Sequence, residues 1–173
     1  MATVKVLQIV GYKNSGKTTV TLQLLKLAKS RGKIISTIKH HGHGGALNMP
    51  DANTDSMQHF DQGAECSIAY GNGVIQMHQR SEDATLEDLI ALAGHENPDF
   101  ILVEGFKEAQ YEKIVLLHSE DDWITLQKLE HIQLVVSPKV VELDNVRMIL
   151  QNDSKQLANW FINWMDGDSH ESV

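Results

Sequence analysis

The sequence predicts an α/β domain of three layers, with a mostly parallel sheet and an antiparallel hairpin at one edge. Apolar, β-branched segments alternate with segments of helical periodicity, an order typical of parallel sheets covered by helices. A glycine-rich loop joins the first predicted strand to the first predicted helix. Further along the chain, Gly71-Asn72-Gly73 separates two short β-type segments, which indicates one hairpin within this order.

The first strand and the loop after it form a phosphate-binding motif. Val4–Val10 is apolar and β-branched, and the spacing Gly11-xxxx-Gly16-Lys17-Thr18 follows it directly. Glycines let backbone N–H groups approach phosphate oxygens, because no side chain blocks the approach. Lys17 can reach the β- and γ-phosphates, the Thr18 hydroxyl can ligate Mg²⁺, and the helix N-terminus favours an anion. The motif therefore predicts a P-loop NTPase-like domain that binds a nucleoside triphosphate.

Periodicity, breakers and turn signals predict the elements of the first half of the chain. Apolar residues at helical spacing follow the loop until Gly32 stops the helix, and an apolar strand comes next. A long loop rich in His and Gly precedes a short helix that Thr54 can cap, and the hairpin follows. In chain order these segments are Val20–Arg31, Lys33–Ile38, Lys39–Asn53, Thr54–Gln62, Cys66–Tyr70 and Val74–His78.

The second half is expected to continue the alternation. Thr85 and Asp88 have the spacing of a capping box, and Gly94 stops that helix. Four short apolar strands follow, and Asp153 or Ser154 can cap a last helix with an aromatic stripe. The helix that Gly94 stops is expected at Thr85–Ala93. The four strands are expected at Phe100–Val103, Ile114–Leu117, Ile132–Val136 and Met148–Leu150.

Length and composition limit the classes of protein that need considering. The 173 residues predict one domain, residues 1–165, followed by a flexible tail, residues 166–173. A net charge of −8 argues against nucleic-acid binding, and no apolar run is long enough for a membrane span. Because the chain opens on a strand, we expect no signal peptide. The single cysteine, Cys66, is expected in the core and fits a reducing cytoplasm.

Two carboxylates are candidates for work at the phosphate site. Glu104 follows the strand Phe100–Val103, where an acid can hold Mg²⁺ directly or through water. The structural alternative for Glu104 is a strand-end carboxylate in water. Asp55 lies in the first turn of its predicted helix and could ligate Mg²⁺ or align water for catalysis; the alternative is a carboxylate that favours the helix dipole.

The histidine loop and the missing base motif leave alternatives open. His40, His41 and His43 could bind a transition metal, but solvated histidines are the commoner outcome in a glycine-rich loop. No Asn-Lys-x-Asp stretch, the usual guanine-reading loop, is present. The residues alone thus predict a triphosphate with Mg²⁺ and do not select the base.

Four stretches occur in an order that resembles a known family. They are GYKNSGKTT, TIKHHGH, TDSMQHFDQGA and DFILVEGFK, and the resemblance covers Val4 to about Leu117. The chain resembles the molybdopterin-guanine dinucleotide biosynthesis protein B (MobB) family. The resemblance implies a homodimeric, GTP-binding protein with weak GTPase activity. Such a protein acts beside the guanylyltransferase that joins GMP to molybdopterin, and molybdopterin itself is a candidate partner.

The resemblance also implies which residues bind. Phosphate and Mg²⁺ binding would fall to Gly11, Asn14, Ser15, Gly16, Lys17, Thr18 and Thr19, with Glu104 and Asp55 nearby. Two other functions remain open: a small kinase or ATP-dependent synthetase, and a GTPase that delivers metal through the histidine loop. The hairpin Cys66–His78 carries few charges, so we expect its edge to form the homodimer interface; the alternative is an edge covered by the chain's own helix Thr85–Ala93.

Overall fold

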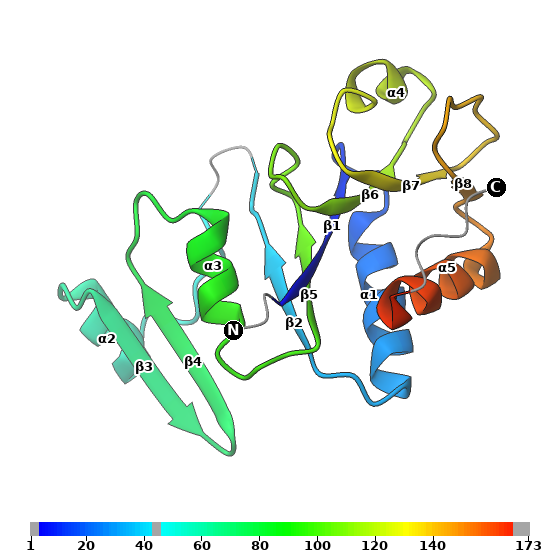
Figure 1. The fold of residues 1–173 in the computed structure, drawn as a ribbon. Coiled ribbons are helices and arrows are strands. Elements are labelled where there is room, and N and C mark those ends of the chain that lie inside the picture. Colours follow the sequence, from blue (N-terminus) through cyan, green and yellow to red (C-terminus); the bar gives the residue numbers. More distant parts are fainter. Residues whose placement is uncertain (1–3, 43–45, 168–173) are drawn as a thin grey trace. The chain divides into compact units, whose positions relative to one another are not determined.

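The computed structural model describes residues 4–42 and 46–167, and these fall into two compact units (Figure 1). The first unit comprises the chain up to His40 and from Leu86 onward, and the second comprises His41–Thr85. The first unit contains a six-stranded sheet in the order β2-β5-β1-β6-β7-β8, and every neighbouring pair in it is parallel. Its strands are β1 (Lys5–Gly11), β2 (Ile35–Lys39), β5 (Phe100–Glu104), β6 (Glu112–Leu116), β7 (Ile132–Ser137) and β8 (Met148–Leu150).

Helices cover both faces of this sheet, which explains why its strands are almost continuously apolar. Figure 1 shows α1 (Lys17–Ser30) and α5 (Ser154–Asp166) side by side, and both pack on one face of the sheet. α3 (Leu86–Ala93) and α4 (Asp121–Leu126) pack against the alternate residues of the strands. The α1/α5 face of the core comprises Leu7, Ile9, Leu24, Leu102, Ile114, Leu116, Phe161 and Trp164, among others. The three-layer α/β class predicted from the sequence is confirmed.

The short helix α4 was not expected from the sequence. Its first turn holds Asp121 and Asp122, which favour the positive end of a helix dipole. Asp122 Oδ2 accepts hydrogen bonds from the backbone N–H groups of His118 (2.7 Å) and Ser119 (3.1 Å). A single turn with only one fully buried residue, Leu126, carries too little apolar periodicity to be recognised.

The second unit consists of α2 (Asp55–Asp61) and a hairpin of β3 (Cys66–Gly71) and β4 (Val74–Gln79). Met57 and Phe60 of the helix are buried, and Ser67 Oγ donates to the Ser56 carbonyl at 2.7 Å. Thr54 precedes the helix as expected, but its hydroxyl donates to the Asp51 carbonyl instead of capping. The hairpin forms a two-stranded sheet of its own, separate from the six-stranded sheet within the described ranges.

The prediction that Cys66 lies in the core is wrong, because Cys66 is exposed. Side chains alternate along a strand, and in β3 it is the next residue, Ser67, that is buried and bonded to α2. Cys66 therefore points the other way, on the same side as Ile68 and Tyr70, both of which are exposed.

No helix within residues 4–42 and 46–167 has the length and apolarity that a membrane crossing requires.

Most of the tail predicted to be flexible, residues 168–173, lies outside the described residues. The final helix ends at Asp166 with Gly167 in a left-handed conformation (φ 87°), as glycine favours at a helix end. At its start, Asp153 caps the helix by accepting from the Gln156 backbone N–H at 2.9 Å. The predicted cap is confirmed.

Candidate phosphate-binding and metal-binding site

The loop between β1 and α1 has the conformation that a phosphate cradle requires. Gly11 and Gly16 have positive φ angles of 153° and 93°, and Asn14 adopts a left-handed φ of 64°. Gly16 is the N-cap residue of α1 and offers no side chain to the first turn. The free amides of that turn and the positive end of the helix therefore remain available to an anion.

A side chain at either loop glycine would force its neighbours to shift, and at Gly11 the neighbour is backbone. A Cβ at Gly11 would lie 2.5 Å from the Leu116 backbone oxygen and 2.6 Å from Ser15 Oγ. A Cβ at Gly16 would lie 2.6 Å from Gln151 Nε2. The loop thus packs tightly between the ends of β6 and β8, which holds its backbone in one shape.

Ser15 supplies an independent sign that the loop is built for a polar ligand. Its hydroxyl is buried, and within the described residues it has no hydrogen-bond partner. Buried polar groups are nearly always hydrogen-bonded, because an unpaired one costs about 1–3 kcal/mol. A phosphate oxygen would satisfy this hydroxyl, so the loop residues fit the group that the motif predicts.

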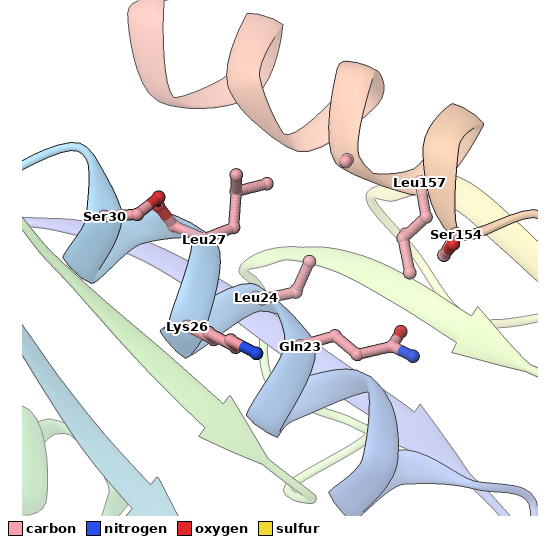
Figure 2. A pocket seen from close by; sticks show the side chains of 8 residues that line it. Gln23, Leu24, Lys26, Leu27, Ser30, Ser154 and Leu157 are labelled. Carbon is pink, nitrogen blue, oxygen red and sulfur yellow. Dashed lines mark hydrogen bonds between the residues drawn. The ribbon is translucent and has the colours of Figure 1, made fainter.

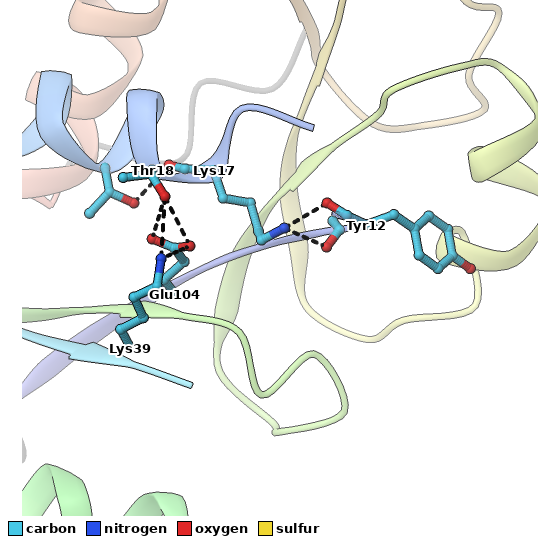
Figure 3. A network of polar contacts seen from close by, with 7 residues as sticks. Tyr12, Lys17, Thr18, Lys39 and Glu104 are labelled. Carbon is cyan, nitrogen blue, oxygen red and sulfur yellow. Dashed lines mark hydrogen bonds and ion pairs between the residues drawn. The ribbon is translucent and has the colours of Figure 1, made fainter. Parts of the chain in front are cut away.

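The Lys17 side chain folds back over the loop that precedes it in the sequence. Its Nζ donates to the carbonyls of Gly11 (3.0 Å) and Tyr12 (2.6 Å), as Figure 3 shows. Burial lowers the pKa of Lys17, the nearby Glu104 carboxylate opposes this shift, and the Lys39 ammonium adds to it. The lysine therefore lies where a negative ligand would favour its charged form.

Glu104 lies at the carboxyl end of the central part of the sheet, beside the loop. β5 pairs with β1 and β2, and this register places Glu104 opposite Ile9 and Lys39. The glutamate is only 8% exposed, and its carboxylate accepts from Thr18 Oγ1 at 3.2 and 3.3 Å and from Lys39 Nζ at 2.8 Å. A carboxylate next to a hydroxyl is a set of hard oxygen donors, the kind that Mg²⁺ prefers. The predicted metal ligands Thr18 and Glu104 are therefore brought together.

The turn after Glu104 is held in an uncommon conformation. Gly105 and Phe106 both have positive φ angles, 104° and 51°. The buried Gln8 side chain donates to both of their carbonyls, at 3.1 and 2.6 Å. The His40 ring stacks on Phe106 with 4.4 Å between ring centroids, and a Cβ at Gly105 would lie 2.8 Å from His40 Cβ. These contacts fix the strand end that carries Glu104.

Sequence reasoning assigned no role to Lys39, Gln8 or Phe106. Lys39 offered one signal, its position at the end of a predicted strand, but its pairing with Glu104 depends on the strand order. Gln8 is polar within an apolar strand, and a buried amide at such a position indicates a hydrogen-bonding duty. Nothing in the sequence pointed to Phe106, whose conformation depends on packing against His40.

The remaining predicted site residues are spread over the chain. Thr19 is exposed in the first turn of α1. Asp55 begins α2 in the second unit, so its place at the phosphate site stays a prediction. His40 is engaged with Phe106, His41 is exposed, and His43 lies outside the described residues.

Two pockets of the first unit lie beside strands or helices that adjoin the phosphate loop. One, of about 350 Å³, opens where β6 and β7 end, on the same edge of the sheet as the phosphate loop. Its lining residues are His118, Ser119, Glu120, Asp121, Ser137, Pro138 and Lys139. The other, of about 340 Å³, lies between α1 and α5 (Figure 2), and its lining includes Leu24, Leu27, Ser154 and Leu157. That second pocket contains none of the predicted site residues.

Comparisons with known proteins point to one family. The family model "Molybdopterin guanine dinucleotide synthesis protein B" (MobB) matches residues 6–138. A Bacillus subtilis protein named "Probable molybdopterin-guanine dinucleotide biosynthesis adapter protein" is 35% identical over 134 residues, 78% of this chain and 77% of that protein. The Escherichia coli molybdopterin-guanine dinucleotide biosynthesis adapter protein is 28% identical over 170 residues, 94% of each chain.

Solved structures agree with this family. The crystal structure of a MobB protein homolog from Bacillus stearothermophilus has a TM-score of 0.79 and 31% identity, covering 94% of this chain and 98% of that one. The crystal structure of Bacillus subtilis MobB has a TM-score of 0.77 and 27% identity, covering 98% and 99%. Similarity thus extends over nearly the whole length of both structures.

Proposed function

The chain belongs to the molybdopterin guanine dinucleotide synthesis protein B family, and we propose that it is a GTP-binding adapter in molybdenum cofactor biosynthesis. It would assist the guanylyltransferase that joins GMP to molybdopterin, in the cytoplasm, with molybdopterin itself as a candidate partner. The observation that carries the nucleotide part of this proposal is the glycine cradle around the buried Ser15 hydroxyl, which has no hydrogen-bond partner among the residues that the structure describes. The adapter part is supported by the names of the relatives.

The residues of the cradle divide the work of binding a triphosphate. Backbone amides from Asn14 to Thr19 and the Ser15 hydroxyl would donate to phosphate oxygens, and Lys17 would neutralise their charge. Thr18 and Glu104 would hold Mg²⁺, which when bound supplies further positive charge to the β- and γ-phosphates. Lys17 already lies across the loop, so its ammonium needs only to exchange carbonyl partners for phosphate oxygens.

We propose that the nucleotide base binds in the pocket at the ends of β6 and β7. It lies beyond the carboxyl ends of parallel strands, where ligands of such sheets bind, and β6 is the direct neighbour of β1. Two acidic residues, Glu120 and Asp121, line it. A carboxylate can accept from the ring N–H and the amino group of guanine together, whereas the corresponding ring nitrogen of adenine is an acceptor. This chemistry favours GTP over ATP.

We propose that hydrolysis by the isolated protein is slow, on the order of 10⁻⁴–10⁻² s⁻¹, as in GTPases that receive no outside help. Asp55 is the candidate for aligning the attacking water. Measuring phosphate release under single-turnover conditions tests this proposal. A rate of about 1–100 s⁻¹ with an identified acceptor would instead favour a small kinase or synthetase.

We also propose a homodimer that forms through the β3–β4 hairpin. Ile68, Tyr70 and Ile75 are 62%, 76% and 66% exposed, and Tyr70 pairs directly with Ile75 across the hairpin. They form one apolar sheet face, the kind of surface that a protein rarely leaves uncovered. Sedimentation of the wild type and of Ile75→Lys tests the interface, with Gln76→Lys on the opposite face as control. A monomeric wild type rejects the dimer, and an Ile75→Lys dimer as tight as the wild type rejects this interface.

The adapter role is tested by reconstituting the reaction with purified guanylyltransferase, molybdopterin, GTP and Mg²⁺. We expect the wild-type chain to raise the rate of dinucleotide formation at limiting GTP, and the folded Lys17→Ala variant to have no such effect. If both chains leave the rate unchanged while the transferase is active alone, the adapter proposal fails. If both chains stimulate equally, the assistance does not depend on the phosphate site.

A further inference from the structure

Lys39 is the residue of the site that has no role so far, and its ammonium lies on the very oxygens proposed to hold Mg²⁺. Its Nζ is 2.8 Å from Glu104 Oε1 and 3.3 Å from Thr18 Oγ1. Figure 3 shows the three side chains converging from β2, β5 and the start of α1. The lysine therefore contacts both predicted protein ligands at once, and on Glu104 it contacts Oε1.

The backbones of both partners in this contact are held in place, but their side chains differ in exposure. The β2–β5 register places Lys39 opposite Glu104, and the His40 backbone N–H donates to the Glu104 carbonyl at 2.9 Å, so both backbones are fixed. The Glu104 side chain is 10% exposed, whereas the Lys39 side chain is 58% exposed. The ammonium can turn into water at small cost, while the carboxylate must stay and needs a positive partner.

We propose that Lys39 is the resident cation of this site, neutralising Glu104 until a divalent cation displaces it, so that the protein accepts Mg²⁺ only together with a nucleotide. An ammonium and a divalent cation cannot share these two oxygens, because they repel each other at such short distances. A triphosphate brings enough negative charge to hold both, and its oxygens give the displaced ammonium a new partner. Lys39 thus sets the order of binding at the nucleotide site, and this inference rests on the proposed function.

Mn²⁺ binding in the absence of any nucleotide tests the proposal, measured by the loss of the electron paramagnetic resonance signal of free Mn²⁺. Mn²⁺ prefers the same oxygen ligands as Mg²⁺. We expect Lys39→Met to bind Mn²⁺ at least about tenfold more tightly than the wild type. A tenfold ratio of affinities corresponds to about 1.4 kcal/mol of competition from the lysine. The double variant Lys39→Met/Glu104→Gln should lose this gain.

Lys33→Met is the matched control, because Lys33 precedes β2 and its ammonium makes a loose, 4.0 Å contact with Asp99 instead of contacting Glu104. An equal gain in Lys33→Met would show a bulk charge effect and overturn the proposal, as would no gain in Lys39→Met. If Lys39→Met is unstable, Lys39→Gln takes its place, with the Mn²⁺-induced rise in melting temperature as the measurement. A rise no larger than in the wild type again overturns the proposal.

The assay contains no nucleotide, so its outcome is independent of GTP binding. If Lys39→Met gains Mn²⁺ affinity and the wild type fails to bind GTP, the competition at Glu104 stands and the proposed function falls. If GTP binds with Mg²⁺ but Lys39→Met gains nothing, the proposed function stands and Lys39 has no such role.

Discussion

The phosphate loop and the β3–β4 hairpin are both short segments that turn at glycines, but they differ in where their contacts are found. In the loop, Lys17 bridges two carbonyls, and Gly11 lies against the Leu116 backbone. In the hairpin, a Cβ at Gly73 would meet none of the described residues within 4 Å, and the outward apolar residues are largely exposed. The loop is shaped by its own chain, whereas the hairpin presents exposed apolar residues, which we propose to be covered by a second copy of the chain.

Replacing Lys17 by Ala should have the largest effect, and on binding alone. The lysine supplies the charge of the loop, so we expect GTP affinity to fall on the order of 10²–10³-fold, as when one partner of a close charge pair is removed. The melting temperature should change little, since the loop backbone is held by its packing. Calorimetry with Lys29→Ala, an exposed lysine in the last turn of α1, is the control. Unaltered affinity in folded Lys17→Ala would remove the loop as the phosphate site.

A pair of glycine substitutions compares the two regions directly. Gly11→Ala would meet backbone at 2.5 Å, whereas Gly73→Ala, also at positive φ, would meet open space. We expect Gly11→Ala to lower the free energy of unfolding by about 2–4 kcal/mol through strain and overpacking. Gly73→Ala should cost only about 1 kcal/mol of backbone strain. Urea denaturation of both variants measures the difference, and equal losses would mean that the loop is no more tightly held than the hairpin.

Neutralising Glu104 should affect the metal requirement more than the fold. Glu104→Gln keeps the shape of the side chain but removes the charge that a hard cation needs. We expect the Mg²⁺ concentration for half-maximal GTP binding to rise about tenfold or more, since even outer partners of metal ligands carry 10–100-fold effects. Glu108→Gln, exposed on the following turn, is the control. An unchanged Mg²⁺ requirement would leave Glu104 without a metal role.

Much of the loop side of this comparison could be predicted from the sequence, because its geometry is local. Gly11, Lys17 and Thr18 follow from their spacing, and Glu104 follows from the rule that parallel strands end at one edge. Lys39 also ends a strand, but its contact with Glu104 requires β2 to lie beside β5, which no local pattern encodes.

The hairpin side was harder to predict for the opposite reason. The turn Gly71-Asn72-Gly73 located the hairpin correctly, yet the face of β3 that is buried depends on its contact with α2. Cys66 was therefore assigned to the wrong face. Because side chains alternate between the two faces of a strand, an assignment that is wrong by one residue places every side chain of the strand on the wrong face.

The smallest effect on the folded chain itself is expected for Ile75→Lys. Ile75 is 66% exposed, so its replacement should change the free energy of unfolding at low protein concentration by no more than about 0.5 kcal/mol. At high concentration the wild type should gain stability from association, and the variant should not. Thermal melts over a range of protein concentrations test this expectation. A concentration-independent wild type would contradict a partner surface formed by a second copy.

We have proposed that the cradle at Gly11–Thr18 binds a guanine nucleotide together with Mg²⁺. Titration calorimetry of the wild-type protein with GTP and with ATP, each with and without Mg²⁺, tests it most directly. We predict saturable binding of one GTP per chain that requires Mg²⁺ for full affinity, and weaker binding of ATP. Absence of GTP binding in the presence of Mg²⁺, by a protein that is folded in the same buffer, would show that the cradle does not serve this nucleotide.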